Sequence, residues 1–472
     1  MNAPITLPLW LVVVLVALSS WALLVLLAAP GMRWFFRRRI NAVIRQVGAS
    51  LQVELPSFKL TRRQVLIDRL FHDDRVQAAA AQQVRAGGLS QAEVRRRIDR
   101  YAREIVPSFN AYLYFRIGYA LARGLARTLY RVRIGYADQE ALARVDPRST
   151  IVFVINHRSN MDYVLVAFLA AERTALSYAV GEWARVWPLQ QLVRAMGAYF
   201  VRRNSGDPLY RAVLSRYVQM AAAGGLTQAV FPEGGLSING RLRQPKLGLL
   251  DYMLKGFDGA EPAGRDLVFI PVGINYDRVL EDRTQLAKLG GAARAPVGRA
   301  RALAIGVGFV VRNLWQALNG RWHRFGYACV NFGQPISLRQ YVAERGLRLP
   351  QLGDAERHAQ VSAFGELLME RIGAVLPVLP VSLIASVLVA EPERLWSALE
   401  LKAQALARAQ RLQRGGAHLY LPRADMDYAF DVGLRMLTLR GLVQQEEGLL
   451  RAVRAELPLL GYYANAIAHL PE

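Results

Sequence analysis

The sequence predicts an α/β fold: a mixed sheet covered by helices, with an N-terminal transmembrane helix and helical sections on both sides of the sheet. Three observations predict it. Between residues 140 and 345, short apolar runs alternate with longer amphipathic stretches, as in sheets whose strands are joined by helices. Residues 1–32 contain an uncharged apolar run, and residues 346–472 are almost entirely helical in pattern.

The apolar run extends from Leu7 to Ala29. A helix of this length spans ~34 Å, against ~30 Å of bilayer hydrocarbon. A cleaved signal peptide is the alternative, but its apolar part is shorter and follows a positive charge. Here the arginines come afterwards, from Arg33 onward. We therefore expect residues 1–32 to be a single-pass anchor, with the rest of the chain cytoplasmic. The Ala-, Arg- and Leu-rich usage suggests a bacterium of high genomic GC, so the expected membrane is a bacterial inner membrane.

Residues 33–139 are predicted to be a helical N-terminal region. Ser90, followed three residues later by Glu93, predicts the capped start of a charged helix over 90–106. A second helix is predicted over 111–132, with four arginines on an otherwise apolar stretch. This helix either packs on the core through its apolar face or lies on a membrane surface with its arginines at the headgroups.

The α/β domain is predicted over residues 140–345. Asp207 is expected to cap one of its helices, with Pro208 at the first position and Gly224 as terminator. The predicted strands cover 150–155, 198–203, 226–231, 266–277 and 327–338, and the predicted helices between them cover 161–172, 183–197 and 207–225.

Composition limits the classes of function. The chain has 472 residues, of which 53% are hydrophobic and 21% charged, so it is not a disordered chain. Sixty Lys and Arg against 37 acidic residues give a formal charge of +23. Such a surface attracts polyanions, among them nucleic acid, anionic lipids and phosphorylated substrates. The single cysteine, Cys329, excludes an internal disulfide framework and is expected to be a buried structural thiol.

Polar residues gather where the predicted strands end. His157 directly follows the first strand of the domain, and Asp162 begins the next helix. A turn between them would bring the carboxylate onto the imidazole, which is the orienter-and-base half of a catalytic triad. No serine or cysteine nucleophile stands beside them, so the expected proton donor is a hydroxyl of a bound substrate. The alternative is a structural pair that caps the end of a strand.

Three further clusters follow later strands. Arg202 and Arg203 emerge from one strand, and Glu233 with two glycines follows another. Arginines suit the geometry of phosphate, and glycines let the backbone approach a ligand. Each cluster alone is more often a solvated turn, but clusters at successive strand ends favour a shared pocket. The third cluster continues to Lys246, and the fourth consists of Asn275, Tyr276 and Asp277.

The order and spacing of these clusters resemble the glycerolipid acyltransferase superfamily, and within it the large membrane-bound glycerol-3-phosphate acyltransferases. The resemblance covers about residues 95–472. It implies that His157 is the catalytic base and that Asp162 orients it. It also implies a set of substrate-binding residues: Arg158, Ser159, Gly197, Phe200, Arg202, Arg203, Glu233, Gly234, Gly235, Ser237, Arg241 and Lys246.

The resemblance further implies transfer of a fatty acyl group from acyl-CoA or acyl carrier protein to the sn-1 hydroxyl of glycerol 3-phosphate, the first step of phospholipid synthesis, at the bilayer. No metal, redox cofactor or nucleic acid is implied. One departure concerns the acceptor, because Leu236 and Ile238 flank Ser237 where the family usually has phosphate-holding arginines. Lysophosphatidate or another lysolipid is therefore the alternative acceptor. A basic membrane protein without activity is the remaining alternative, but it gives no reason for four spaced motifs.

Overall fold

The computed structural model describes residues 57–87, 89–111, 113–170, 176–181, 189–202, 205–258, 264–289, 325–422 and 425–472. The anchor expected at residues 1–32 lies outside these ranges, as does Arg203. Within them, no helix combines the length and the apolar character that crossing a bilayer requires.

The described part of the chain confirms the helix-covered mixed sheet. Its eight strands follow the order β1-β7-β6-β2-β5-β3-β4, with β8 paired to β6. The run from β6 through β2, β5 and β3 to β4 is parallel, whereas β7 and β8 are antiparallel to β6. The carboxyl ends of β6, β2, β5 and β3 therefore share one edge. The strands are β1 Arg131–Ala137, β2 Thr150–Ile155, β3 Ser177–Val180, β4 Tyr199–Phe200, β5 Gln228–Val230, β6 Leu267–Tyr276, β7 Tyr327–Phe332 and β8 Ile336–Ser337.

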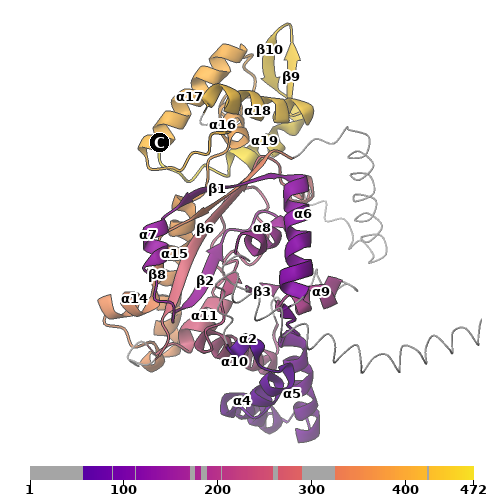
Figure 1. The fold of residues 1–472 in the computed structure, drawn as a ribbon, viewed down its shortest axis with the longest axis vertical. Helices are drawn as coiled ribbons and strands as arrows, with labels where there is room; N and C mark the ends of the chain where they lie inside the picture. Colours follow the sequence, from indigo (N-terminus) through magenta and orange to yellow (C-terminus); the bar gives the residue numbers. More distant parts are fainter. Residues whose placement is uncertain are drawn as a thin grey trace, which may run out of the picture.

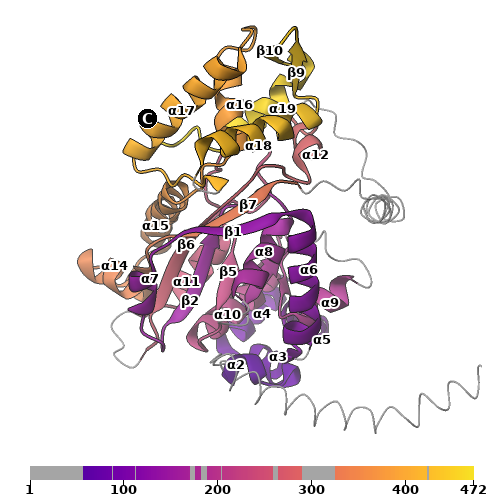
Figure 2. The ribbon, with the colours of Figure 1, turned by 45° about the horizontal axis from the view of Figure 1, so that its top comes forward.

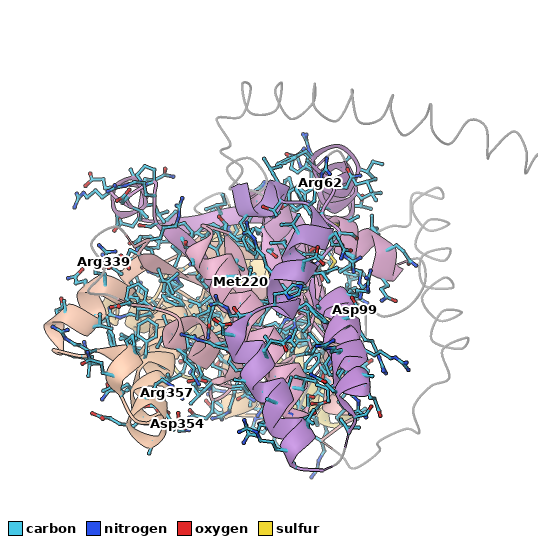
Figure 3. All side chains as sticks on the ribbon, turned by 90° about the horizontal axis from the view of Figure 1, so that it is seen from below. Arg62, Asp99, Met220, Arg339, Asp354 and Arg357 are labelled. Atoms are coloured by element: carbon cyan, nitrogen blue, oxygen red, sulfur yellow. The ribbon has the colours of Figure 1, made fainter. Side chains whose placement is uncertain are left out.

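One face of the sheet is covered by helices that follow its strands, and the N-terminal helices pack on one of these, α10 (Figures 1 and 2). Seen from below, Met220 of α10 lies between Asp99 of α5 and Arg339 of α14 (Figure 3). Both groups of helices therefore bury apolar side chains against the same core. These helices are α2 Ser57–Leu60, α3 Arg63–Phe71, α4 Asp74–Arg85, α5 Gln91–Ile105, α10 Pro208–Ala223, α11 Gly248–Lys255, α14 Leu338–Glu344 and α15 Asp354–Ala374.

The other face carries a second core, built with α6, α8 and the C-terminal region (Figure 2). That region lies at one end of the molecule, opposite α2–α5 (Figure 1). It contains a hairpin besides helices, although the sequence indicated helices almost throughout. Its elements are α16 Pro380–Ala390, α17 Ala398–Arg414, α18 Met426–Leu439, β9 Val443–Glu446, β10 Leu449–Ala452 and α19 Leu457–Ala464; α6 is Tyr119–Leu129 and α8 is Met161–Ala170.

Local signals place several helix ends as expected. The Ser90 side chain accepts the amide of Glu93 at the start of α5, and Asp207 accepts two amides at the start of α10. The helix predicted over 111–132 is a π-helix, Leu113–Gly118, followed by α6. Ala122 and Ala126 are buried and α6 packs on α8, as the core-facing interpretation expects. Leu121 and Leu125 on another side of α6 are exposed.

Two short strands of the sheet were not predicted. β1 directly follows α6 and pairs with β7, so the sheet already begins at Arg131, before the boundary expected at residue 140. Its first two residues were included in the helix predicted over 111–132, and residues 133–137 were assigned to no strand. β3 is only four residues long, too short for a clear period.

Cys329 is buried in β7, and burial raises the pKa of its thiol to about 12, as a structural role requires.

Asp277 follows β6 and is 1% exposed. Its Oδ2 accepts the amide of Tyr327 at 2.8 Å, and the backbone amide of Val381 is a second donor near the carboxyl. Burial, which penalises the charged form, raises the pKa of this carboxyl to about 7.

Asp277→Asn is expected to gain stability relative to the wild type as the pH rises from about 5 to about 8. The folded pKa lies above the unfolded value of ~3.9. The native state therefore holds the proton longer, and its stability falls as pH rises between these values and is level above them. Asparagine has no charge to bury. Thermal unfolding at the two pH values measures the change, with the exposed Asp431→Asn as control. An Asp277→Asn shift in Tm that is equal at both pH values would contradict the expectation.

Candidate active site

The loop between β2 and α8 is fixed by hydrogen bonds to β6. The Asn156 side chain donates to the carbonyl of Ile274 at 2.9 Å and accepts its amide at 2.7 Å. These two bonds extend the β2–β6 ladder by one residue through a side chain. His157 is thereby held at the carboxyl edge of the sheet.

His157 and Asp162 form a buried pair. His157 Nδ1 lies 2.9 Å from Asp162 Oδ2, and the two residues are 2% and 0% exposed. The same oxygen accepts the amides of Arg158 and Ser159, at 2.8 and 3.0 Å, and Asp162 Oδ1 accepts the Tyr276 hydroxyl. Because the Asp162 carboxylate only accepts hydrogen bonds, it favours the tautomer of His157 that carries its proton on Nδ1. The other ring nitrogen, Nε2, is then the acceptor.

Glu233 ties the loop after β5 to the His157 loop. Its Oε1 accepts the amide of His157 at 2.7 Å, and its Oε2 accepts the amide of Arg243 at 3.0 Å. Glu233 is 1% exposed, and burial raises its pKa to about 7, against the two amide hydrogen bonds that lower it. The Ser237 amide adds a bond to the His157 carbonyl at 2.8 Å. Glu233 therefore positions the histidine and does not line the cavity in front of it.

A cavity of about 480 Å³ lies in front of His157. The Phe231 ring lies 4.2 Å from the imidazole, centroid to centroid, and also lines the cavity. Apolar side chains from several helices line it further, among them Leu214 and Leu368. The cationic side chains that line it within the described chain are those of Arg202, Arg211 and Lys246. The cavity thus combines an apolar wall, a histidine and positive charge.

The backbone of Gly234 lies directly beside the Lys246 side chain. Its φ is +65°, in the left-handed region that favours glycine, and a Cβ there would lie 2.6 Å from Lys246 Cδ. Lys246 is exposed, and its amide donates to the Pro232 carbonyl at 2.8 Å. The glycine of the third cluster thus places a lysine stem at the cavity wall.

Arg202 lines the cavity but is bound to an acid. Its guanidinium makes two hydrogen bonds to the carboxylate of Glu104 on α5, with Nε 2.9 Å from Oε1, and lies over the rings of Tyr101 and Tyr210. The pair raises the pKa of Arg202. Arg202 therefore joins α5 to the rim of the cavity.

Of the residues that the resemblance implies for the site, His157, Arg202, Gly234 and Lys246 line the cavity. Others have structural partners elsewhere. Arg158 is buried, donates to Asn275 Oδ1 at 2.9 Å and lies over the Tyr462 ring. Ser159 donates to Glu281 Oε2 at 2.7 Å. Neither residue lines the cavity, and both hold the loop; their assignment to substrate binding stays a prediction.

Five more expected site residues lie away from the cavity. Gly197 is at the opposite edge of the sheet, where its carbonyl accepts the Ser177 hydroxyl at 2.6 Å. Phe200 is buried in the core, and the Ser237 hydroxyl donates to the Arg241 carbonyl at 2.7 Å. Gly235 and Arg241 likewise do not line the cavity, and Arg203 is outside the described residues. A motif residue can therefore position its neighbours without touching a substrate.

Sequence reasoning did not identify Glu281, which accepts the amide and side chain of Asn160 as well as the Ser159 hydroxyl. It noted Tyr276 as part of a cluster, without its bond to Asp162. It also gave no role to Arg211. Amides at the start of α8, candidates for stabilising an oxyanion, already have acceptors: Met161 donates to Ser159 Oγ at 3.1 Å.

Helix α19 of the C-terminal region packs against the loop that follows β5. Gly240 has φ +86°, and a Cβ there would lie 1.9 Å from the carbonyl oxygen of Tyr462 in α19. Asn465 donates to the Asn239 carbonyl at 2.9 Å, and the Tyr463 hydroxyl accepts the amide of Val279 at 3.1 Å. The C-terminal region thus contacts the loops that carry the site.

Residues 133–275, which include His157 and Asp162, match the acyltransferase family. Residues 312–471 match the family described as the glycerol-3-phosphate acyltransferase C-terminal region. The chain is a member of the glycerolipid acyltransferase superfamily.

Curated relatives agree with this assignment. A glycerol-3-phosphate acyltransferase of Aeromonas hydrophila is 28% identical over 87% of this chain, and one of Pseudomonas entomophila is 26% identical over 92%. The chain spans about half the length of these relatives, 50% and 52%. The crystal structure of a 1-acyl-sn-glycerophosphate acyltransferase from Thermotoga maritima aligns with 66% of this chain and with 97% of the Thermotoga chain, at 17% identity. The TM-score is 0.28, which is too low for a comparison of geometry.

Proposed function

We propose that the chain is a glycerol-3-phosphate O-acyltransferase that takes a fatty acyl group from an acyl thioester. The observation that carries the proposal is the His157–Asp162 pair facing a cavity with an apolar wall and cationic side chains. An acyl chain is compatible with the apolar part and a phosphate with the cations. The names of the relatives support the same acceptor. The thioester donor is acyl-CoA or acyl carrier protein.

In the proposed mechanism, His157 Nε2 removes the proton of the sn-1 hydroxyl as its oxygen attacks the thioester carbonyl. Asp162 accepts the Nδ1 proton in a hydrogen bond and stabilises the imidazolium that forms. The tetrahedral intermediate then collapses, the C–S bond breaks, and the thiolate takes the proton from His157. No acyl-enzyme is formed, and no metal or redox cofactor is part of this scheme.

The first test is release of free CoA from palmitoyl-CoA, followed with a thiol reagent. We expect release that depends on glycerol 3-phosphate, with one ester formed per thiol, because the hydroxyl is the nucleophile. Trapping of a stoichiometric acyl-enzyme, or release at the same rate without an acceptor, would contradict direct transfer.

A lysolipid acceptor is the second candidate. Leu236 and Ile238, both partly exposed, take the positions where the resemblance implies arginines that hold a phosphate. Lysophosphatidate carries the same phosphate with an added acyl chain. Comparing initial rates with glycerol 3-phosphate and with lysophosphatidate, each at subsaturating concentration, decides between the two acceptors.

We also propose that residues 7–29 anchor the chain in a membrane, with the acyltransferase domain on the cytoplasmic side. The support is the uncharged apolar run followed by arginines from Arg33. Resistance to alkaline extraction of the full chain, lost in a variant that lacks residues 1–32, is the expected result.

A further inference from the structure

We propose that Arg211 of α10 binds the phosphate of the acceptor. No motif of the sequence includes this residue. The inference rests on the proposed acyl transfer, because it assigns a part of that substrate to a side chain. It arises from the distribution of charge around the cavity in front of His157.

The cavity is lined by cations whose surroundings differ. Arg202 is committed to Glu104 by two hydrogen bonds. Arg211 is exposed, and within the described residues no carboxylate forms an ion pair with it. The cavity lining includes no Asp or Glu in the described part of the chain. An anion that enters would therefore find the guanidinium of Arg211 available, whereas that of Arg202 already has its counter-charge.

Arg211 and Leu214 of α10 line the cavity with side chains of different character. Arg211 lies four residues after the cap Asp207, in the first turns of the helix. Leu214, one turn further, is buried and also lines the cavity. Residues three apart lie on the same side of a helix. This side of α10 thus presents a charge at the exposed rim and an apolar side chain deeper in.

The arrangement suits an acceptor whose phosphate stays at the rim while the acyl chain of the thioester donor lies deeper. A guanidinium can give a phosphate two parallel hydrogen bonds, which an ammonium group cannot. Lys246 lies on the cavity wall as well and would add a second charge. Tyr252 also lines the cavity, and the charge of Arg211 lowers the pKa of its hydroxyl while burial raises it by more. Arg211 would supply the binding that the leucine and isoleucine beside Ser237 cannot.

The test compares wild type, Arg211→Gln and Arg211→Lys in thiol release from palmitoyl-CoA, with glycerol 3-phosphate varied. Loss of charged hydrogen bonds predicts a rise in KM for glycerol 3-phosphate of roughly 10- to 100-fold in Arg211→Gln. The kcat should stay within about threefold, since His157 and Asp162 are unchanged. Arg211→Lys should recover part of the affinity. Arg96→Gln, at an exposed arginine of α5, is the matched control and should leave KM unchanged.

Two further measurements assign the phosphate. With saturating glycerol, which has none, wild type and Arg211→Gln should react equally fast. An unchanged KM for glycerol 3-phosphate in Arg211→Gln overturns the inference. So does a KM that rises for palmitoyl-CoA but not for the acceptor, because Arg211 would then bind the donor's phosphates.

Calorimetric binding of glycerol 3-phosphate separates this inference from the proposed function. If wild type binds it but releases no thiol, and Arg211→Gln does not bind it, the phosphate site stands and acyl transfer fails. If wild type releases thiol and both proteins bind equally, acyl transfer stands and the role of Arg211 fails. Absence of both binding and thiol release in wild type overturns both.

Discussion

Replacement of His157 by alanine is expected to lower acceptor-dependent release of CoA by about 10²- to 10⁴-fold, the range for a general base. The imidazole lines the cavity, its Nδ1 is held by Asp162, and no other histidine lines that cavity within the described chain. Without Nε2, the acceptor hydroxyl would have to lose its proton to water. The rate of thiol release at saturating acceptor and donor measures the loss.

The matched control for His157→Ala is His358→Ala, at an exposed histidine of α15. The folded state of both variants is checked by thermal unfolding, because the His157 ring also contacts Phe231 and Tyr163. A folded His157→Ala protein that turns over near the wild-type rate would refute the assignment of the base. It would leave the pair as a structural cap of the β2 end.

Arg440→Met is expected to destabilise the protein by about 3–5 kcal/mol, as when one partner of a buried ion pair is removed. Arg440 NH2 lies 2.6 Å from Asp282 Oδ2, and the side chains are 10% and 6% exposed. The Tyr463 hydroxyl bonds to both partners. Methionine preserves most of the volume but leaves the carboxylate of Asp282 buried without its cation. Urea-induced unfolding gives the change in free energy.

Arg435→Met, at an exposed arginine of α18, the helix that ends just before Arg440, is the control for Arg440→Met and should change stability by no more than about 0.5 kcal/mol. Adding Asp282→Leu to Arg440→Met removes the uncompensated charge, so the double variant should recover part of the loss. If the double variant loses more free energy of unfolding than the two single variants do together, the pair does not behave as a buried salt bridge.

The edge of the sheet that carries the site could be predicted because the strands that define it are apolar runs of clear length. β2, β6 and β7 were all predicted, and His157 and Asp162 follow from their place at the end of β2. β1 and β3 were not, since one continues a helix and the other has four residues. The β9–β10 hairpin was not predicted either: it turns at Glu447 and Gly448, both at positive φ, whereas such turns favour Asn, Asp or Gly at the first of these positions.

The roles of individual motif residues could not be predicted, because their partners are far away along the chain. The carbonyl that accepts from Arg158 is that of Tyr462, 304 residues later, and Ser159 donates to Glu281, 122 residues later. Arg202 is occupied by Glu104, 98 residues earlier. No local pattern tells an arginine that binds substrate from one that binds a distant carboxylate. Arg211 is the reverse case, a residue outside every motif that the fold brings to the cavity.

The contact between Gly240 and the carbonyl of Tyr462 limits how this chain can be recombined with its relatives. The sheet domain and the C-terminal region match two separate families, which invites exchange of one half for another. The backbone of α19, however, passes within the space that a methyl group at Gly240 would occupy. A chimaera would have to preserve the path of that helix as well as its sequence, so the two halves have to be exchanged together.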